Sequence, residues 1–163
     1  MAVKYKGNLG AFLDMIRHSE LGDKIIAASD SGYNVIVGST PTKLILMKDY
    51  KDHPHQLQTM VINGNSVSST AAGGFQLLGR YWDVYKKQLA LSDFSPTSQE
   101  TVAVQQIQEC RALGDINAGR FADAVQKCSR IWASLPGATY GQHVNGLADL
   151  QAFYLRAGGK LTP

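Results

Sequence analysis

A glutamate follows an apolar helical run near the start of the chain. Glu20 ends the stretch "AFLDMIRHSE", on the last turn of an expected helix that stops at Gly22. The negative end of the helix dipole, burial against apolar neighbours and loss of water on ligand binding would each raise the pKa of this carboxyl group. A carboxylic acid that keeps its proton near neutral pH can protonate the leaving oxygen of a glycosidic bond. On position alone, a solvated surface glutamate is the more common interpretation.

Glycosidases of the common type use a second carboxylate. A frequent phage lysozyme pattern has Glu, eight residues, Asp, five residues and Thr, but this chain has Ser29 and Val35 at the last two positions. The other downstream candidates are Asp23, Asp30, Asp49 and Asp52. The missing partner indicates an enzyme that needs only one catalytic acid, with a hydrolase that uses Asp30 or Asp49 to position water as the alternative.

Two stretches carry residue types that could bind a sugar. In "STAAGGFQLL", Ser69 and Thr70 offer hydroxyl groups, Gly74 permits close approach to the backbone, and Gln76 could bond a sugar hydroxyl or acetamide. An ordinary loop that caps a helix is an equally common reading of this stretch. In "LPGATYGQH", the ring of Tyr140 could stack on a sugar face and the amide of Gln142 could bond it, although a packed turn is the commoner reading.

Metal and thiol chemistry have weaker signals. His53 and His55 have an H-x-H spacing, but no cysteine or further histidine lies near them in sequence and Pro54 favours a turn, so neither a metal nor a cofactor is predicted.

Cys110 and Cys128 lie far apart, each within a helical pattern. They are interpreted as reduced, buried thiols, with a single disulfide as the alternative.

The hydrophobic periodicity indicates the elements that position these residues. A helix is expected at 8–20 with Asn8 as its N-cap, followed by strands at 33–38, 42–47 and 59–63. Four helices are then expected, at 71–91, 95–113, 120–135 and 144–159. Strands gathered in one segment with helices elsewhere favour an α+β fold, with a cleft where two lobes meet.

Composition limits the class of protein. The chain has 163 residues, 44% hydrophobic and 18% charged, which is typical of one globular domain. The net charge of +3 favours anionic partners weakly, but the basic residues are scattered, so no nucleic-acid partner is predicted. The chain lacks a long apolar run and a signal-peptide pattern, so we expect no membrane insertion and a cytoplasmic protein.

Several long stretches resemble the phage lambda endolysin family, lytic transglycosylases of the lysozyme-like superfamily. They are "AFLDMIRHSE", "GYNVIVG", "DHP", "STAAGGFQLL", "YWDVYKKQLALSDFSP", "VAVQQI" and "CSRIWASLPGATYGQ". The resemblance implies a single lysozyme-like catalytic domain over residues 1–163, with a mainly helical lobe, a small antiparallel β lobe at about 30–64 and a substrate cleft. It also implies cleavage of the β-1,4 bond between N-acetylmuramic acid and N-acetylglucosamine, with formation of a 1,6-anhydro ring.

The family's single catalytic glutamate falls on Glu20, as general acid and then general base. Beside it, we expect substrate contacts from seven residues: Asn34, Ser69, Thr70, Gly74, Gln76, Tyr140 and Gln142. Two departures stand out. The family's "GYDVIVG" reads "GYNVIVG" here, so Asn34 replaces an aspartate, and the segment 38–51 is longer than the family's.

The resemblance further implies a setting for the enzyme. It would be a monomer that accumulates in the host cytoplasm, is released by a membrane-lesion protein (a holin) without a stable complex, and then acts on periplasmic peptidoglycan strands. Two other functions stay open at this point. One is a hydrolytic muramidase, and the other is a peptidoglycan-binding module without activity.

Overall fold

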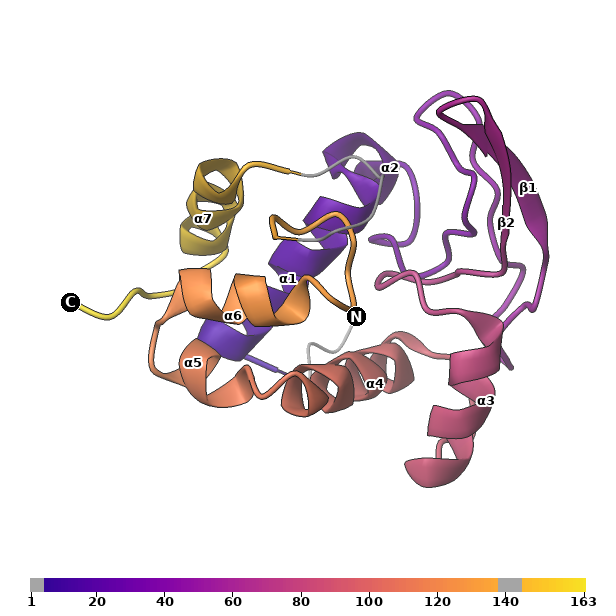
Figure 1. The fold of residues 1–163 in the computed structure, drawn as a ribbon. Coiled ribbons are helices and arrows are strands. Elements are labelled where there is room, and N and C mark those ends of the chain that lie inside the picture. Colours follow the sequence, from indigo (N-terminus) through magenta and orange to yellow (C-terminus); the bar gives the residue numbers. More distant parts are fainter. Residues whose placement is uncertain (1–4, 138–144) are drawn as a thin grey trace. The chain divides into compact units, whose positions relative to one another are not determined.

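The computed structural model describes residues 5–137 and 145–163, and within them the chain is mainly helical with one small sheet (Figure 1). The helices are α1 (Gly7–Leu21), α2 (Asp23–Ala27), α3 (Gly79–Gln88), α4 (Pro96–Glu109), α5 (Leu113–Asn117), α6 (Phe121–Cys128) and α7 (Leu147–Arg156). The strands are β1 (Gln58–Ile62) and β2 (Asn65–Ser69). The chain divides into two compact units: the first has the residues up to 20 and from 103 onward, and the second has residues 21–102.

Aromatic contacts hold the helices of the first unit together. Phe12 of α1 meets Phe121 of α6 edge-on, with ring centroids 6.1 Å apart, and Phe121 lies 4.7 Å from the ring of Tyr154 of α7. Figure 1 shows α1, in indigo, lying among the later helices α5, α6 and α7. The apolar stripe of α1 that the sequence shows is therefore the face that meets α6 and α7.

Asn8 does not cap α1, so that prediction is wrong. The helix already includes Asn8, and its side chain reaches distant backbone instead. The amide nitrogen of Asn8 donates to the carbonyl of Ile116 at 3.0 Å, and its oxygen accepts from the backbone nitrogen of Lys160 at 2.8 Å. These two bonds tie the start of α1 to α5 and to the C-terminal segment.

The second unit has its own apolar core around the indole of Trp82. The buried members of this core are Ile36, Ala72, Leu77, Trp82, Phe94 and Val102. Trp82 and Phe94 make an edge-to-face contact with centroids 4.9 Å apart, and Trp82 Nε1 donates to Asp52 Oδ1 at 2.6 Å. The fully buried indole therefore has both apolar packing and a partner for its N–H group.

The sheet is a hairpin of β1 and β2 that pairs Gln58 with Ser69 and Ile62 with Asn65. The expected strand at 59–63 is confirmed, and its partner is the serine-rich stretch 65–69, for which the sequence predicted no strand. Asn63 and Gly64 form the turn with φ of 51° and 77°, the positive values that a two-residue hairpin of this kind needs.

The two earlier strands, expected at 33–38 and 42–47, are not formed. The segments lie side by side through isolated bridges such as Val35–Leu46, and Ile36 N donates to Ile45 O at 2.8 Å. Pairing ends within a few residues because Gly38 turns the chain at φ 89° and the proline at position 41 cannot donate a ladder hydrogen bond. The predicted strands are therefore turns and bridges.

The remaining helices are shorter than the periodicity predicts. The helix expected at 71–91 begins at Gly79, because Gly73 (φ 84°) and Gln76 (φ 49°) turn the chain before it. The helix expected at 95–113 ends at residue 109, and Arg111 (φ 58°) starts a turn into α5. The last two expected helices shorten to α6 and α7.

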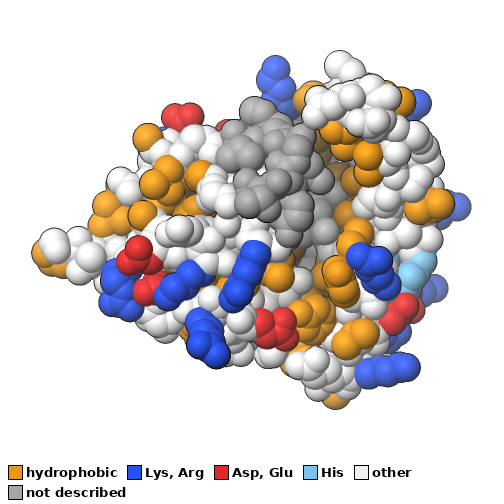
Figure 2. Space-filling model, in the orientation of Figure 1, with side chains coloured by type: hydrophobic (Ala, Val, Ile, Leu, Met, Phe, Trp, Pro, Cys, Tyr) orange, Lys and Arg blue, Asp and Glu red, His pale blue; other side chains and the backbone are white. Residues whose placement is uncertain are grey.

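The basic side chains are scattered over the surface, as the sequence predicts. Figure 2 shows Lys and Arg side chains spread over the visible face, with acidic and uncharged groups between them. Among the described residues, no helix has the length and apolar character that crossing a membrane would require.

Candidate active site

Helix α1 places Glu20 at its C-terminal end, one residue before the helix stops. The apolar residues Phe12, Met15 and Ile16 on the same helix are fully buried, so they set the rotation of α1. Ser19 is 7% exposed and Glu20 is partly buried. The packing of α1 therefore fixes where Glu20 lies, at the partly exposed end of the helix.

Two polar residues from distant parts of the sequence, Ser134 and Asn145, contact the end of α1. Ser134 Oγ donates to Glu20 Oε1 at 2.9 Å and lies 2.9 Å from Ser19 Oγ. Asn145 Nδ2 donates to Ser19 Oγ at 2.9 Å, and its backbone nitrogen donates to the Ser134 carbonyl at 2.9 Å. Ser134 is thus held from two sides while it contacts the carboxylate.

The environment of Glu20 favours the protonated carboxyl group. Burial raises its pKa to about 7, and the hydrogen bonds from the hydroxyl and backbone of Ser134 oppose that rise because they stabilise the carboxylate. Near neutral pH the group therefore exists in both forms. Such a carboxyl can give a proton to a leaving oxygen and take one back, as a general acid–base catalyst must.

Asn34 belongs to the second unit and has a structural role there. Its Oδ1 accepts a hydrogen bond of 2.9 Å from the backbone nitrogen of Asp30, and its carbonyl accepts from Met47 N at 2.8 Å. An aspartate oxygen could accept the first bond equally well. An Asn34→Asp substitution would therefore keep this turn and add a negative charge.

The four predicted sugar-binding positions of residues 69–76 all make internal hydrogen bonds. Ser69 Oγ accepts from Ala71 N at 3.1 Å, and Thr70 Oγ1 accepts from the backbone nitrogen of Gly79 at 3.0 Å. Gly74 N donates to Gln99 Oε1 at 2.9 Å.

Gln76 Nε2 donates to Gly73 O at 2.8 Å. These contacts shape the loop of residues 69–76, and binding of a sugar by these residues stays a prediction. Tyr140 and Gln142 lie outside the described residues.

Gln99, on α4, organises this loop and was not predicted from the sequence. Its Oε1 accepts from Gly74 N, and its Nε2 donates to Tyr33 O at 3.0 Å and to Phe94 O at 2.9 Å. The residue is 3% exposed. A glutamine in a helical run carries no signal of such a role, because each of its three partners comes from another segment.

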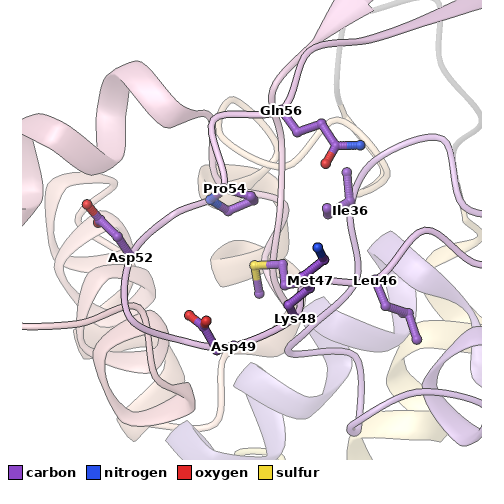
Figure 3. Close-up of a pocket in the computed structure, with 8 residues that line it drawn as sticks. All are labelled: Ile36, Leu46, Met47, Lys48, Asp49, Asp52, Pro54 and Gln56. Carbon is purple, nitrogen blue, oxygen red and sulfur yellow. The ribbon is translucent and has the colours of Figure 1, made fainter.

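The two aspartates of the alternative hydrolase already have partners. Asp30 Oδ2 accepts from the Tyr50 hydroxyl, and Asp49 Oδ1 accepts from Lys51 N at 2.9 Å. Asp49 also lines a pocket of about 260 Å³ in the second unit (Figure 3). The eight lining residues are Ile36, Leu46, Met47, Lys48, Asp49, Asp52, Pro54 and Gln56, and none of them is a predicted substrate-binding residue.

His53 and His55 use their ring nitrogens within the second unit. His53 Nε2 bonds the Leu77 carbonyl at 2.8 Å, and its Nδ1 accepts from His55 N at 3.0 Å. His55 Nε2 contacts Asp83 Oδ1 at 2.9 Å. Within the described part of the chain, no group of three or more His, Cys, Asp or Glu residues could hold a metal ion.

Comparisons with solved structures show the class of fold. The structure of bacteriophage lambda lysozyme complexed with a chitohexasaccharide matches with a TM-score of 0.84 and 44% sequence identity, covering 98% of this chain and 99% of that one. A second structure of lysozyme from bacteriophage lambda matches with a TM-score of 0.81. The chain therefore has the lysozyme-like α+β fold that the sequence predicts.

Sequence comparisons show the family. The profile of the Endolysin family matches residues 10–161. The endolysin of Escherichia phage P2 is 46% identical over 154 residues, 93% of each chain. The endolysin of Escherichia phage lambda is 48% identical over 150 residues, 91% of this chain and 90% of that protein. The chain thus belongs to the endolysin family, peptidoglycan-degrading enzymes of the phage lysozyme type.

Proposed function

We propose that this endolysin is a lytic transglycosylase that cleaves the β-1,4 bond between N-acetylmuramic acid and N-acetylglucosamine, with Glu20 as its one catalytic acid. The observation that carries the proposal is a single carboxyl group with a pKa near 7, held by Ser134 at the end of α1. The absent Asp and Thr of the common phage lysozyme pattern support it as well.

The proposed reaction needs only this one group and the substrate. Glu20 gives its proton to the glycosidic oxygen as the bond to C1 of the muramyl residue breaks. The resulting carboxylate then takes the proton of the C6 hydroxyl, whose oxygen attacks C1 and closes a 1,6-anhydro ring. Glu20 ends protonated, as it began, and no water is consumed. A pKa near 7 is suitable because the group must be a competent acid first and a competent base afterwards.

The setting of the reaction is also part of the proposal. We place the substrate contacts at Asn34, Ser69, Thr70, Gly74, Gln76, Tyr140 and Gln142, and the whole chain acts as one monomeric catalytic domain. Family membership supports action on periplasmic peptidoglycan after holin-dependent release from the host cytoplasm.

Product analysis tests the reaction type. Purified peptidoglycan digested with the enzyme and analysed by mass spectrometry should contain anhydro-muramyl ends, each one water lighter than a hydrolysis product. Reducing ends in their place would overturn the proposal and identify a hydrolytic muramidase. Asp30→Asn and Asp49→Asn should keep anhydro products, whereas a hydrolase that uses either carboxylate would lose activity.

The Glu20→Gln variant tests the acid. Its activity should fall by roughly two orders of magnitude or more, because loss of general acid–base catalysis costs at least that much. Its circular dichroism spectrum should match the wild type. Retained clearing of peptidoglycan would exclude Glu20 as the acid, and sedimentation of the unaltered chain with cell walls without any clearing would identify a binding module.

A further inference from the structure

The two cysteines of the chain lie together in the first unit although they are far apart in sequence. Cys110 comes directly after α4, and Cys128 is the last residue of α6. They are 2% and 0% exposed, and both are reduced in this structure. Helical periodicity predicts that each is buried, but it does not indicate that they meet.

Contacts on either side of the two cysteines hold the ends of α4 and α6 against each other. Lys127 Nζ donates to the Arg111 carbonyl at 3.4 Å, and Arg130 Nη2 donates to the Glu109 carbonyl at 3.3 Å. Lys127, just before Cys128, and Arg130, two residues after it, thus contact the two residues that flank Cys110. Between these two contacts, the thiols of Cys110 and Cys128 are themselves hydrogen-bonded.

The charges around the pair make the two thiols unequal. The hydrogen bond from Cys128 lowers the pKa of Cys110, burial opposes this, and the guanidinium group of Arg130 lowers it further. The same hydrogen bond, together with burial, raises the pKa of Cys128. Glu109 and Asp115 are the acidic groups that act in the opposite sense to Arg130. Cys110 is therefore the thiolate of the pair, and Cys128 is the proton donor.

We propose that Cys110 and Cys128 are a dithiol–disulfide site that closes when the folded protein meets an oxidising disulfide such as oxidised glutathione. The Cys110 thiolate attacks one sulfur of the oxidant, forms a mixed disulfide and releases one glutathione thiolate. Cys128 then loses its proton and attacks the Cys110 sulfur, so the Cys110–Cys128 bond forms and the second glutathione leaves. Two protein thiols are oxidised and one disulfide is reduced, and the two glutathione thiolates take up the proton of Cys128 and the proton that Cys110 released to solvent when it ionised.

The position of Cys110 at the end of a helix gives the oxidant a way in. The regular part of α4 ends at residue 109, and Arg111 has the positive φ of a turn. Helix ends and turns open locally at low free-energy cost, whereas fully buried positions such as that of Cys128 open much more rarely. Cys110 is therefore the first residue attacked, and Cys128 is the residue that resolves the mixed disulfide.

The bond would cross-link α4 to α6 inside the unit that contains Glu20. Closing the loop between residues 110 and 128 restricts the unfolded chain, so the thermal midpoint should rise by about 5–10 °C. Peptidoglycan lies outside the cytoplasmic membrane, where disulfides persist. The cross-link would thus stabilise the enzyme in the compartment of its substrate, although the thiol chemistry itself does not depend on the proposed function.

The test uses the full chain, reduced and then transferred without oxygen into buffers with increasing ratios of oxidised to reduced glutathione. The expected product is a monomer lighter by two hydrogens, with a Cys110–Cys128 peptide in a non-reducing digest and the higher thermal midpoint. An unchanged mass, stable glutathione adducts, or disulfide-linked dimers as the main product would each overturn the proposal. Peptidoglycan activity is not a readout, so its presence or absence does not affect the result.

Three variants sharpen the experiment. Cys110→Ala should resist oxidation while it is folded, and Cys128→Ala should stop at a glutathione adduct on Cys110. Arg130→Gln should still form the internal disulfide but severalfold more slowly near neutral pH, because less of Cys110 is thiolate. Equal rates for Arg130→Gln and the wild type would overturn the assignment of Cys110 as the attacking thiolate. Circular dichroism of Cys128→Ala shows whether this fully buried substitution folds, and the wild-type mass decides the proposal in either case.

Discussion

Ser134 Oγ lies 2.9 Å from Oε1 of Glu20 and donates a hydrogen bond to it across more than a hundred residues of sequence. Burial raises the pKa of the carboxyl group to about 7, and this bond holds it below the value that burial alone would give. Ser134 is itself fixed by the backbone nitrogen of Asn145 at 2.9 Å. The acidity of Glu20 therefore depends on a contact that can be altered without changing the carboxylate.

Replacing Ser134 should shift the pH dependence of activity. Activity that needs protonated Glu20 falls as pH rises through its pKa, and Ser134→Ala removes a bond that favours the charged form. The fall of activity on the alkaline side of the pH–activity curve should therefore move to higher pH, by up to about one pH unit. Initial rates of peptidoglycan clearing from about pH 5 to about pH 9 measure this.

A matched control for that variant is Ser129→Ala. Ser129 is also buried, but its hydroxyl donates to the Gln126 carbonyl at 2.7 Å and not to Glu20. Its descending limb should coincide with that of the wild type. A limb that moves to lower pH in Ser134→Ala would contradict the role given to the hydrogen bond.

Glu20 should make the fold less stable as pH rises. Its folded pKa of about 7 lies above the usual value of 4.5, so its contribution to stability is fully present below pH 4.5 and is lost as pH rises through 7. Glu20→Gln cannot titrate. Its free energy of unfolding should therefore exceed that of the wild type increasingly between these pH values, by at most about 3 kcal/mol above pH 7.

Urea unfolding of both proteins at several pH values measures this difference. Ser129→Ala serves as a control, because Ser129 is buried and carries no titratable group. Its difference from the wild type should stay constant across the same range. A wild type that gains stability relative to Glu20→Gln as pH rises would show that the carboxyl is not destabilised by burial.

Tyr33 should stabilise the second unit through a buried carboxylate. Its hydroxyl donates to Glu100 Oε1 at 2.6 Å, both residues are 5% exposed, and Glu100 Oε2 has no hydrogen-bond partner among the residues that the structure describes. Tyr33→Phe should lower the free energy of unfolding by about 2 kcal/mol, because a buried acceptor loses its donor. Tyr81→Phe, at a position that is 46% exposed, should change it by less than about 0.5 kcal/mol. Equal effects would contradict this account.

Gly73 should be replaceable only at a high cost in stability. It has φ 84°, and an added Cβ would lie 2.5 Å from Gln99 Oε1 and 3.1 Å from the ring of Phe94. Gly64 has a similar φ of 77° but open space around it. Gly64→Ala should therefore show the backbone strain alone, about 1–2 kcal/mol, whereas Gly73→Ala should add the clash and cost about 3 kcal/mol or more. Thermal unfolding compares the two, and equal losses would mean that Gln99 moves aside freely.

Local patterns predicted those parts of the fold that neighbouring residues control. The apolar spacing of residues 9–16 gives α1, and Asn63 with Gly64 fits the hairpin turn after β1. The strands expected at 33–38 and 42–47 were wrong because β-favouring residues say nothing about whether a partner strand can stay in register. The helix expected from residue 71 was wrong because positive φ values at Gly73 and Gln76 turn the chain first.

By itself, the sequence determined that one acid stands at the end of a helix and that the usual second carboxylate is missing from its expected position. The long stretches that resemble endolysins also indicated the family. Only the tertiary structure decided that this acid is partly buried, that Ser134 contacts it while Asn145 holds Ser134, and that Cys110 meets Cys128. The physical reason is the range of the interactions. Helical periodicity depends on residues three or four positions apart, whereas pKa values and thiol contacts depend on groups that only folding brings together.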